Sequence, residues 1–155
     1  MRCYLASRYS RREELLGYAA ELRALGHEVT SRWLLGNHEM SDREVASEAA
    51  NQERVRFALE DWEDLEAADC GIAFTEPPRS EFSRGGRHVE AGAALAWEKL
   101  VYLVGPVENV FYALPQVRRF RSWEECAAVL AKPLDEVTTL RDGVRMTIRV
   151  PGGRD

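Results

Sequence analysis

The order of apolar segments along the chain constrains its fold more than any other feature. Short apolar runs of strand length alternate with segments whose apolar residues recur at helical spacing. We expect strands at 2–7, 27–33, 69–75, 99–105 and, more weakly, 117–120. Helices of about ten or more residues between strands require crossover connections, so these strands should run parallel. The pattern therefore predicts an α/β fold with helices on both faces of the sheet.

Helix starts are marked by Ser-x-x-Glu capping boxes at Ser10–Glu13, Ser41–Glu44 and Ser122–Glu125. The second should open a long helix that ends near Ala68. Another helix, rich in Ala and Gly, should cover about 87–98. Near the C-terminus, two alternating arms surround an Asp-Gly pair in residues 138–150, which predicts a β-hairpin.

Composition excludes several classes of protein. The chain has 155 residues, enough for one domain with a sizeable core, and a formal net charge of −5, which disfavours duplex nucleic acid as a partner. It contains no apolar run near the ~20 residues that span a bilayer, and the N-terminal apolar segment is too short for a signal peptide. Its three cysteines show no CxxC spacing and its three histidines no zinc pattern. We expect buried free thiols, no metal, no membrane contact and a cytoplasmic location.

Ligands of parallel α/β sheets bind on the loops that follow the carboxyl ends of the strands. The longest such loop, 76–86, ends in Gly85 and Gly86 and leads to Glu90. We expect Glu90 in the first helical turn, where the helix dipole would keep it ionised, as a nucleophile requires. The alternative is an ordinary helix-start carboxylate. The small residues that follow, 91–94, would let this helix lie close against the sheet.

A second carboxylate, Asp61, lies among apolar positions on its helix. At 100° per residue, Phe57, Ala58, Leu65 and Ala68 fall within about 60° of it. A carboxylate there must pair, face a cavity or become protonated. The alternative is a structural Asp bound by a backbone N–H or by Arg54. Asp69 should be structural, at the opposite end of the sheet.

Four segments carry a resemblance to a known family: YLASRYS, EDWEDLEAADCGIAF, GGRHVEAGAALA and GPVENVFYALPQV. In order and spacing they resemble the nucleoside 2-deoxyribosyltransferase family, which includes nucleoside 5′-monophosphate N-glycosidases. The similarity covers residues 1–131, which we treat as one domain, with 132–155 as a C-terminal extension. It implies a Rossmann-like or flavodoxin-like three-layer sandwich with a mostly parallel five-stranded sheet, no cofactor, and a homodimer or larger homo-oligomer.

The resemblance also implies roles for individual residues. Glu90 matches the nucleophile, Asp61 the group that moves protons near the base, and Tyr4 the tyrosine that orients the nucleophile. Asn109 lies in the segment that can reach a neighbouring subunit's site. The implied activity is cleavage or exchange of the N-glycosidic bond of a (deoxy)nucleoside or its 5′-monophosphate through a covalent glycosyl-glutamate.

One departure from the family bears on the substrate. Where the family often carries Asp or Ser, six residues before the nucleophile, this chain has Arg84, with Ser83 and Arg87 beside it. Arginines near a helix N-terminus suit a phosphate, so we expect a 5′-monophosphate to be preferred. The loop after the first strand contributes Ser7 and Arg8. Trp33 and Trp62 are candidates for stacking on a base or for core packing.

Two other classes of function remain open on the sequence. One is a non-catalytic nucleotide-binding or sensor domain of the same fold, which the presence of both Glu90 and Asp61 disfavours. The other is a flavodoxin-like module, which should carry a Thr/Ser-rich phosphate loop after the first strand; this chain lacks one.

Overall fold

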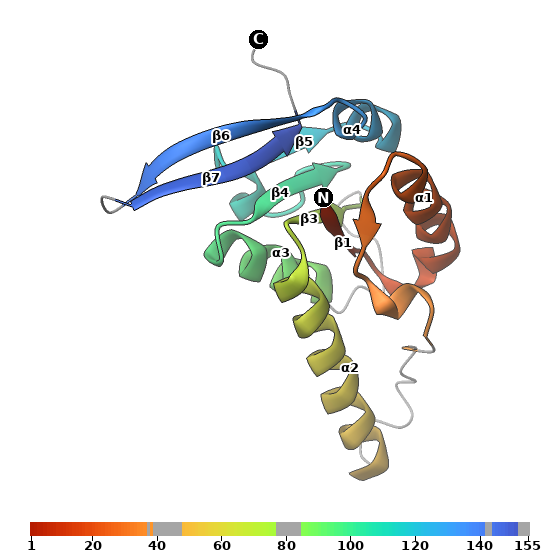
Figure 1. The fold of residues 1–155 in the computed structure, drawn as a ribbon. Helices are drawn as coiled ribbons and strands as arrows, with labels where there is room; N and C mark the ends of the chain where they lie inside the picture. Colours follow the sequence, from red (N-terminus) through yellow and green to blue (C-terminus); the bar gives the residue numbers. More distant parts are fainter. Residues whose placement is uncertain (37, 39–47, 77–84, 142–143, 152–155) are drawn as a thin grey trace.

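The expected sheet is present and all of its strand pairs are parallel. The computed structural model describes residues 1–36, 38, 48–76, 85–141 and 144–151 (Figure 1). The strand order is β2-β1-β3-β4-β5, and every neighbouring pair is parallel. The strands are β1 (Arg2–Ala6), β2 (Glu28–Val29), β3 (Cys70–Phe74), β4 (Leu100–Val104) and β5 (Val117–Phe120). From β1 the chain passes to β2 on one side and then crosses to β3 on the other side of β1, so the order in which strands are added reverses between β1 and β3. Ligands of such sheets bind at this switch point.

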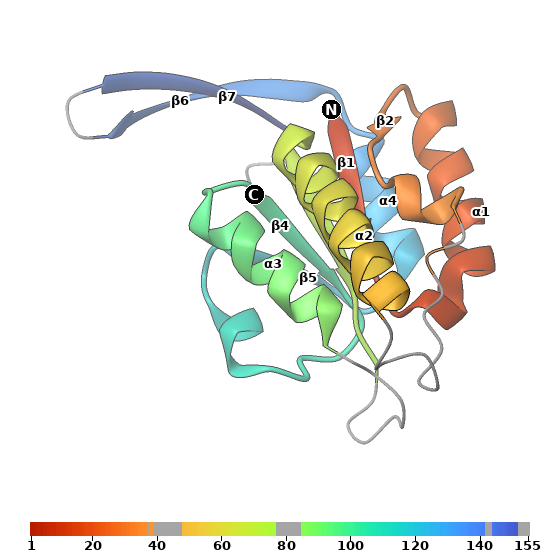
Figure 2. The ribbon, with the colours of Figure 1, turned by 90° about the horizontal axis from the view of Figure 1, so that it is seen from below.

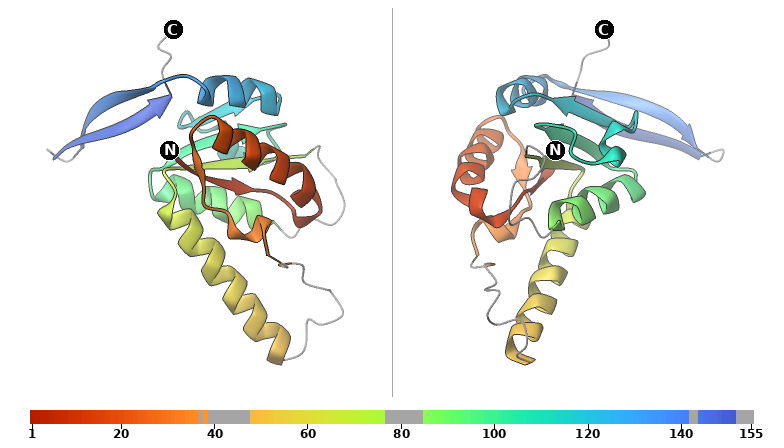
Figure 3. Two further views of the ribbon diagram at one scale, coloured as in Figure 1. Left: turned by 45° about the vertical axis from the view of Figure 1, so that its right-hand side comes forward. Right: turned by 180° about the vertical axis from the view of Figure 1, so that it is seen from behind.

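Helices cover both faces and complete three layers. On one face α1 (Arg12–Ala24) lies beside α4 (Trp123–Leu130). On the other face α2 (Glu48–Ala67) lies beside α3 (Gly86–Ala96), the pair that faces the viewer in Figure 2. The N-terminal half of α2 extends beyond the sheet, as Figure 3 shows from two further sides. This arrangement confirms the predicted three-layer α/β class.

The close approach of α3 to the sheet comes from small residues on both elements. Ala91 and Ala94 are buried against the core, and a Cβ added to Gly71 of β3 would lie 3.4 Å from the Cβ of Ala94. Gly92, in contrast, is exposed, and a Cβ there would meet nothing within 4 Å. The expectation that the whole 91–94 segment faces the sheet is therefore wrong, because the helical period turns Gly92 outward.

The second strand is shorter than the predicted 27–33. Beyond Val29 the chain no longer pairs as a strand, and side chains complete the edge of β1 instead. The Oγ of Ser31 accepts from the N–H of Leu5 at 2.7 Å, and the Nε1 of Trp33 donates to the carbonyl of Leu5 at 2.8 Å. Trp33 lies in the short 3₁₀ helix η2 (Arg32–Leu34).

Two of the three predicted capping boxes can be compared with the structure. Ser122 caps α4, its Oγ accepting from the N–H of Glu125 at 3.5 Å. Ser10 does not cap α1, because it lies inside a 3₁₀ turn, η1 (Tyr9–Arg11), that delays the start of the helix. The Ser41–Glu44 box lies outside the described residues.

A two-stranded antiparallel ribbon follows α4. It consists of β6 (Leu134–Arg141) and β7 (Val144–Pro151), so it is longer than the predicted 138–150. Apart from each other, β6 and β7 have no extensive contact with any other described element, and Figure 3 shows the ribbon projecting from the body.

Gly105, directly after β4, provides a test of packing near the switch point. Its φ is +116°, and an added Cβ would lie 2.8 Å from both the carbonyl oxygen and the Oγ1 of Thr75. We expect Gly105→Ala to lower the free energy of unfolding by about 2–4 kcal/mol, from backbone strain and overlap together. Chemical denaturation measures this.

Gly17 is the matched control. It lies within α1, and a Cβ there would meet nothing within 4 Å. Gly17→Ala should raise the free energy of unfolding by about 1 kcal/mol, because Ala has the higher helix propensity. Equal effects of the two substitutions would contradict the assignment of strain to Gly105.

Candidate active site

A tyrosine and a glutamate from distant parts of the chain meet where α3 packs on the sheet. The Tyr4 hydroxyl, fully buried on β1, donates to the Oε1 of Glu90 on α3 at 2.9 Å. Gly85 precedes α3 with a φ of +79°, a conformation that favours glycine. Because α3 begins at Gly86, Glu90 lies beyond the first turn, not within it as expected from the sequence.

The environment of Glu90 favours its protonated form. Burial raises the pKa of Glu90 to about 7, and the negative charge of Asp61 adds to this shift. The hydrogen bond from Tyr4 and the positive charge of Arg87 act in the opposite direction on the same pKa. The expectation of a carboxylate kept ionised by the helix dipole is therefore incorrect: desolvation outweighs the favourable partners.

Asp61 of α2 is a second carboxyl group that holds a proton near neutral pH. Burial raises the pKa of Asp61 to about 7, followed by the negative charges of Asp64 and Glu60, against a smaller opposing effect of Arg32. Its Oδ1 is buried and has no hydrogen-bond partner. The raised pKa agrees with the apolar helical arc read from the sequence.

The two carboxyl groups differ in the hydrogen bonds that they receive. Glu90 receives a hydrogen bond from Tyr4, which stabilises a carboxylate, whereas the Oδ1 of Asp61 receives none. The pKa of each group is raised to about 7, so near neutral pH the pair can hold a single proton.

The Arg87 side chain is bound by a carboxylate from another segment of the chain. It is buried, and its Nε donates to the Oε1 of Glu108 at 2.8 Å. Glu108 also accepts from the backbone N–H of Glu76 at 3.1 Å and lies 3.2 Å from the Nε2 of His88. The other ring nitrogen of His88 is 2.9 Å from the Tyr112 hydroxyl. Sequence reasoning missed Glu108, because nothing in its local pattern marks it as a partner of a residue 21 positions earlier.

Ser7 and Arg8 follow β1 at the switch point. The Nε of Arg8 lies 2.6 Å from the Oε1 of Glu76, the second residue after β3. The Oγ of Ser7 is buried without a hydrogen-bond partner.

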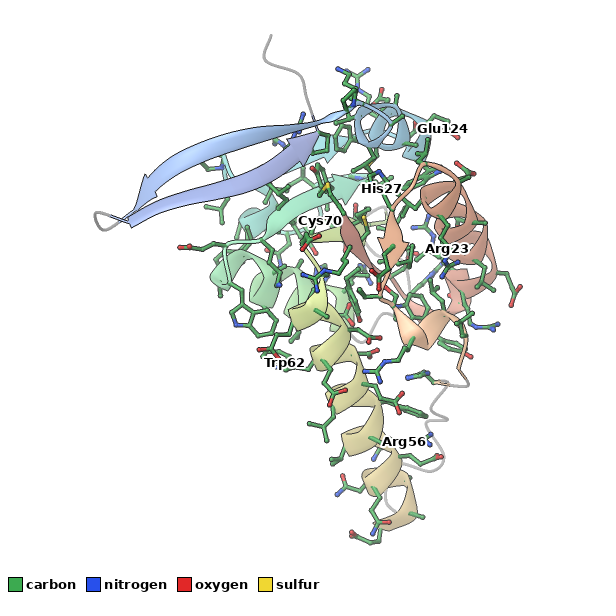
Figure 4. The ribbon with its side chains drawn as sticks, in the orientation of Figure 1. Arg23, His27, Arg56, Trp62, Cys70 and Glu124 are labelled. Carbon is green, nitrogen blue, oxygen red and sulfur yellow. The ribbon has the colours of Figure 1, made fainter. Side chains whose placement is uncertain are left out.

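The remaining predicted residues lie in varied surroundings. Trp33 is buried, with its indole N–H bound to Leu5 and its ring 6.3 Å from that of Tyr9, which is core packing. Trp62, labelled in Figure 4, is 46% exposed on α2. Its ring meets that of Trp97 edge-on, with 4.7 Å between the ring centroids. Asn109 caps the 3₁₀ helix η4 (Val110–Ala113), accepting from the N–H of Phe111. Ser83 and Arg84 lie outside the described residues.

Asp69 has the structural role expected of it. At the amino end of β3 its carboxylate accepts from the backbone N–H of Arg2 at 2.7 Å and from the guanidinium at 2.9 Å. Cys3, Cys70 and Cys126 are buried free thiols, as predicted.

Among the residues that the structure describes, no group of three or more His, Cys, Asp or Glu side chains is arranged to hold a metal ion. Among the described helices, none combines the length and the apolar character needed to cross a membrane.

Several solved structures are similar to this chain, and three of them are described below. A 2-deoxyribosyltransferase of Bacillus psychrosaccharolyticus matches with a TM-score of 0.63 and 23% identity, over 84% of this chain and 96% of that one. A CMP N-glycosidase of Clostridium botulinum matches with a TM-score of 0.51 and 20% identity, over 83% and 96%. A conserved protein of Enterococcus faecalis matches with a TM-score of 0.52 and 15% identity, over 84% of this chain and 96% of that one. These likenesses confirm the fold that the sequence resemblance implied.

No family model matches the chain, and neither does any curated protein sequence.

The raised pKa of Asp61 predicts an unusual effect on stability. The folded protein retains a proton that the unfolded chain releases, so this group favours folding below about pH 4 and that contribution is lost as pH rises through about 7. At pH 8, Asp61→Asn should therefore have a higher free energy of unfolding than the wild type. Since Asp61 is partly exposed, we expect on the order of 1–2 kcal/mol, and no difference near pH 4.

Asp64 is the matched control on the same helix. It is buried and accepts from the backbone N–H and the Nε of Arg32, each at 2.6 Å. Asp64→Asn should lower the free energy of unfolding at pH 8 by about 1–3 kcal/mol, because charge-assisted hydrogen bonds are lost. Thermal or urea unfolding at the two pH values separates the residues; destabilisation by Asp61→Asn at pH 8 would show that its carboxylate is satisfied.

Proposed function

We propose that this protein cleaves or exchanges the N-glycosidic bond of a (deoxy)nucleoside or its 5′-monophosphate through a covalent glycosyl-Glu90 intermediate. The observation that carries the proposal is the Tyr4–Glu90 hydrogen bond beside Asp61, a carboxyl group whose pKa is raised to about 7. The proposal assigns the charge to Glu90, which accepts from Tyr4, and the proton to Asp61, whose Oδ1 has no hydrogen-bond partner.

In the first half-reaction, an oxygen of the Glu90 carboxylate attacks the anomeric carbon of the sugar. The bond to the base nitrogen breaks, its electron pair stays on the base, and the Asp61 carboxyl gives its proton to the departing base. The transition state carries positive charge on the sugar, which the nearby Glu90 carboxylate stabilises. The products are free base, glycosyl-Glu90 and ionised Asp61.

In the second half-reaction, the Asp61 carboxylate takes a proton from water or from an incoming base. The deprotonated atom attacks the anomeric carbon, and the ester bond to Glu90 breaks. Water as acceptor gives hydrolysis, and a second base gives transfer. Both outcomes return Glu90 and Asp61 to their starting protonation states.

The comparisons support this proposal at the level of reaction class. A 2-deoxyribosyltransferase and a CMP N-glycosidase share the fold, and both names denote chemistry at an N-glycosidic bond. The candidate nucleophile of this chain lies on α3, a helix that contacts the central strands β1 and β3. The cleft expected of such a sheet opens at the same strands.

Trapping of the intermediate tests the nucleophile. We expect a slow 2′-fluoro nucleoside analogue to leave an adduct of sugar mass on the wild-type protein, detected by intact mass spectrometry and mapped to the peptide of Glu90. Glu90→Ala should form no adduct and lose at least about 10³-fold in kcat. Glu98→Gln, beyond the end of the same helix, is the control, and it should keep both adduct formation and the wild-type kcat. Turnover of Glu90→Ala at the wild-type rate would end the proposal.

The Tyr4 hydroxyl should control the acid limb of the pH–rate profile. Activity needs Glu90 ionised and Asp61 protonated, so kcat/KM should be bell-shaped around neutral pH. Tyr4→Phe removes a hydrogen bond that lowers the pKa of Glu90, so the acid limb should move to higher pH by about one unit or more.

Tyr112→Phe is the control for this experiment. It removes another buried tyrosine hydroxyl, one that contacts His88 and not a carboxylate. Its acid limb should match that of the wild type. Identical shifts in the two variants, or none in Tyr4→Phe, would contradict the assigned role of Tyr4.

A further inference from the structure

An incompletely satisfied ion pair lies at the switch point. The Nε of Arg8 is 2.6 Å from the Oε1 of Glu76, yet this N–H is buried and makes no aligned hydrogen bond. The side chain of Glu76 is 7% exposed, and its Oε2 is buried without a hydrogen-bond partner. The neighbouring Ser7 also has a buried Oγ without a partner.

Such atoms are costly in a protein that has no ligand. A buried polar group without a partner costs about 1–3 kcal/mol, and more when it is charged. In the described part of the chain, six buried side-chain atoms have no hydrogen-bond partner, and three of them belong to Ser7, Arg8 and Glu76. They come from the segments that leave β1 and β3, the two strands between which this class of sheet binds ligands.

The cluster is connected to the candidate active site. The backbone N–H of Glu76 donates to Glu108, and Glu108 accepts from Arg87, which lies three residues before Glu90 on α3. Asp61, in contrast, is influenced by charges on α2 and by Arg32. In the proposed function Asp61 protonates the base, so the sugar is the part of the substrate that would reach toward Glu76.

The charges of this region do not favour an added anion. Arg8 pairs with Glu76, Arg87 with Glu108 and Arg11 with Glu14. Each of these three described arginines is thus matched by a carboxylate, and the open acceptor is an oxygen of the Glu76 carboxylate. A hydroxyl donates to such an oxygen, whereas a phosphate is repelled by it.

We propose that Glu76, Arg8 and Ser7 form a hydroxyl-binding subsite in which Glu76 accepts from a sugar hydroxyl and excludes a phosphate at that position. This inference rests on the proposed function. The arginines in the sequence predicted a preference for phosphate. At the position that Glu76 contacts, this inference predicts the opposite preference.

The test is equilibrium binding, measured by calorimetry on the Glu90→Ala protein so that nothing is turned over. The ligands are a 2′-deoxynucleoside, its 3′-monophosphate and its 5′-monophosphate. At least one monophosphate should bind about tenfold or more weakly than the nucleoside. Adding Glu76→Gln should reduce that same penalty about tenfold, because the repelling charge is gone and the amide keeps the shape.

Two further variants separate specificity from folding. Arg8→Gln with Glu76→Gln removes both charges, leaves no unpaired arginine, and should reduce the same phosphate penalty. Glu13→Gln, an exposed partner of Arg12, should leave all three affinities unchanged. Equal affinities for the three ligands, or a penalty that survives both Glu76 variants, would overturn the subsite while leaving the proposed function standing. If none of the three ligands binds, the proposed function fails and this inference fails with it.

Discussion

The contact between α3 and the middle of the sheet determines where the candidate catalytic groups lie. Gly71 leaves room on β3 for Ala94, which brings the helix down onto the strands and places Glu90 within 2.9 Å of the Tyr4 hydroxyl. A Cβ at Gly71 would already touch Ala94 at 3.4 Å, so a side chain larger than that of Ala would have to displace α3, because interiors are close-packed. The candidate nucleophile is thus positioned by backbone packing, and the hydrogen bond from Tyr4 depends on that packing.

Several groups at the site are costly to the folded protein. Asp61 and Glu76 each hold a buried carboxyl oxygen without a hydrogen-bond partner, and burial raises the pKa of Glu90. Asp64, on the same helix as Asp61, is instead satisfied: it binds Arg32 through two hydrogen bonds of 2.6 Å. Buried carboxyl groups that remain without a partner are typical of functional sites, where stability is lost in exchange for activity.

The arginines show how tertiary contacts change the meaning of a charge. Read along the chain, Arg84, Arg87 and Arg8 suggest a phosphate site; Arg84 lies outside the described residues. In the fold, carboxylates from distant segments, Glu76 and Glu108 among them, neutralise two of the three. Our proposal follows from this pairing: the open acceptor oxygen of Glu76, and not a free arginine, would distinguish one ligand from another.

Some features were determined by the sequence alone. Apolar runs and helical periods are local, so they indicated the parallel sheet, the burial of Asp61 on its helix and the Ser122 cap of α4. Local patterns were misleading where long-range contacts compete with them: the edge of β1 is completed by Ser31 and Trp33, which ends β2 at Val29. The partner of Arg87, the pKa of Glu90 and the open oxygen of Glu76 were decided only by the tertiary structure, because desolvation and ion pairing depend on which distant segments the fold brings together.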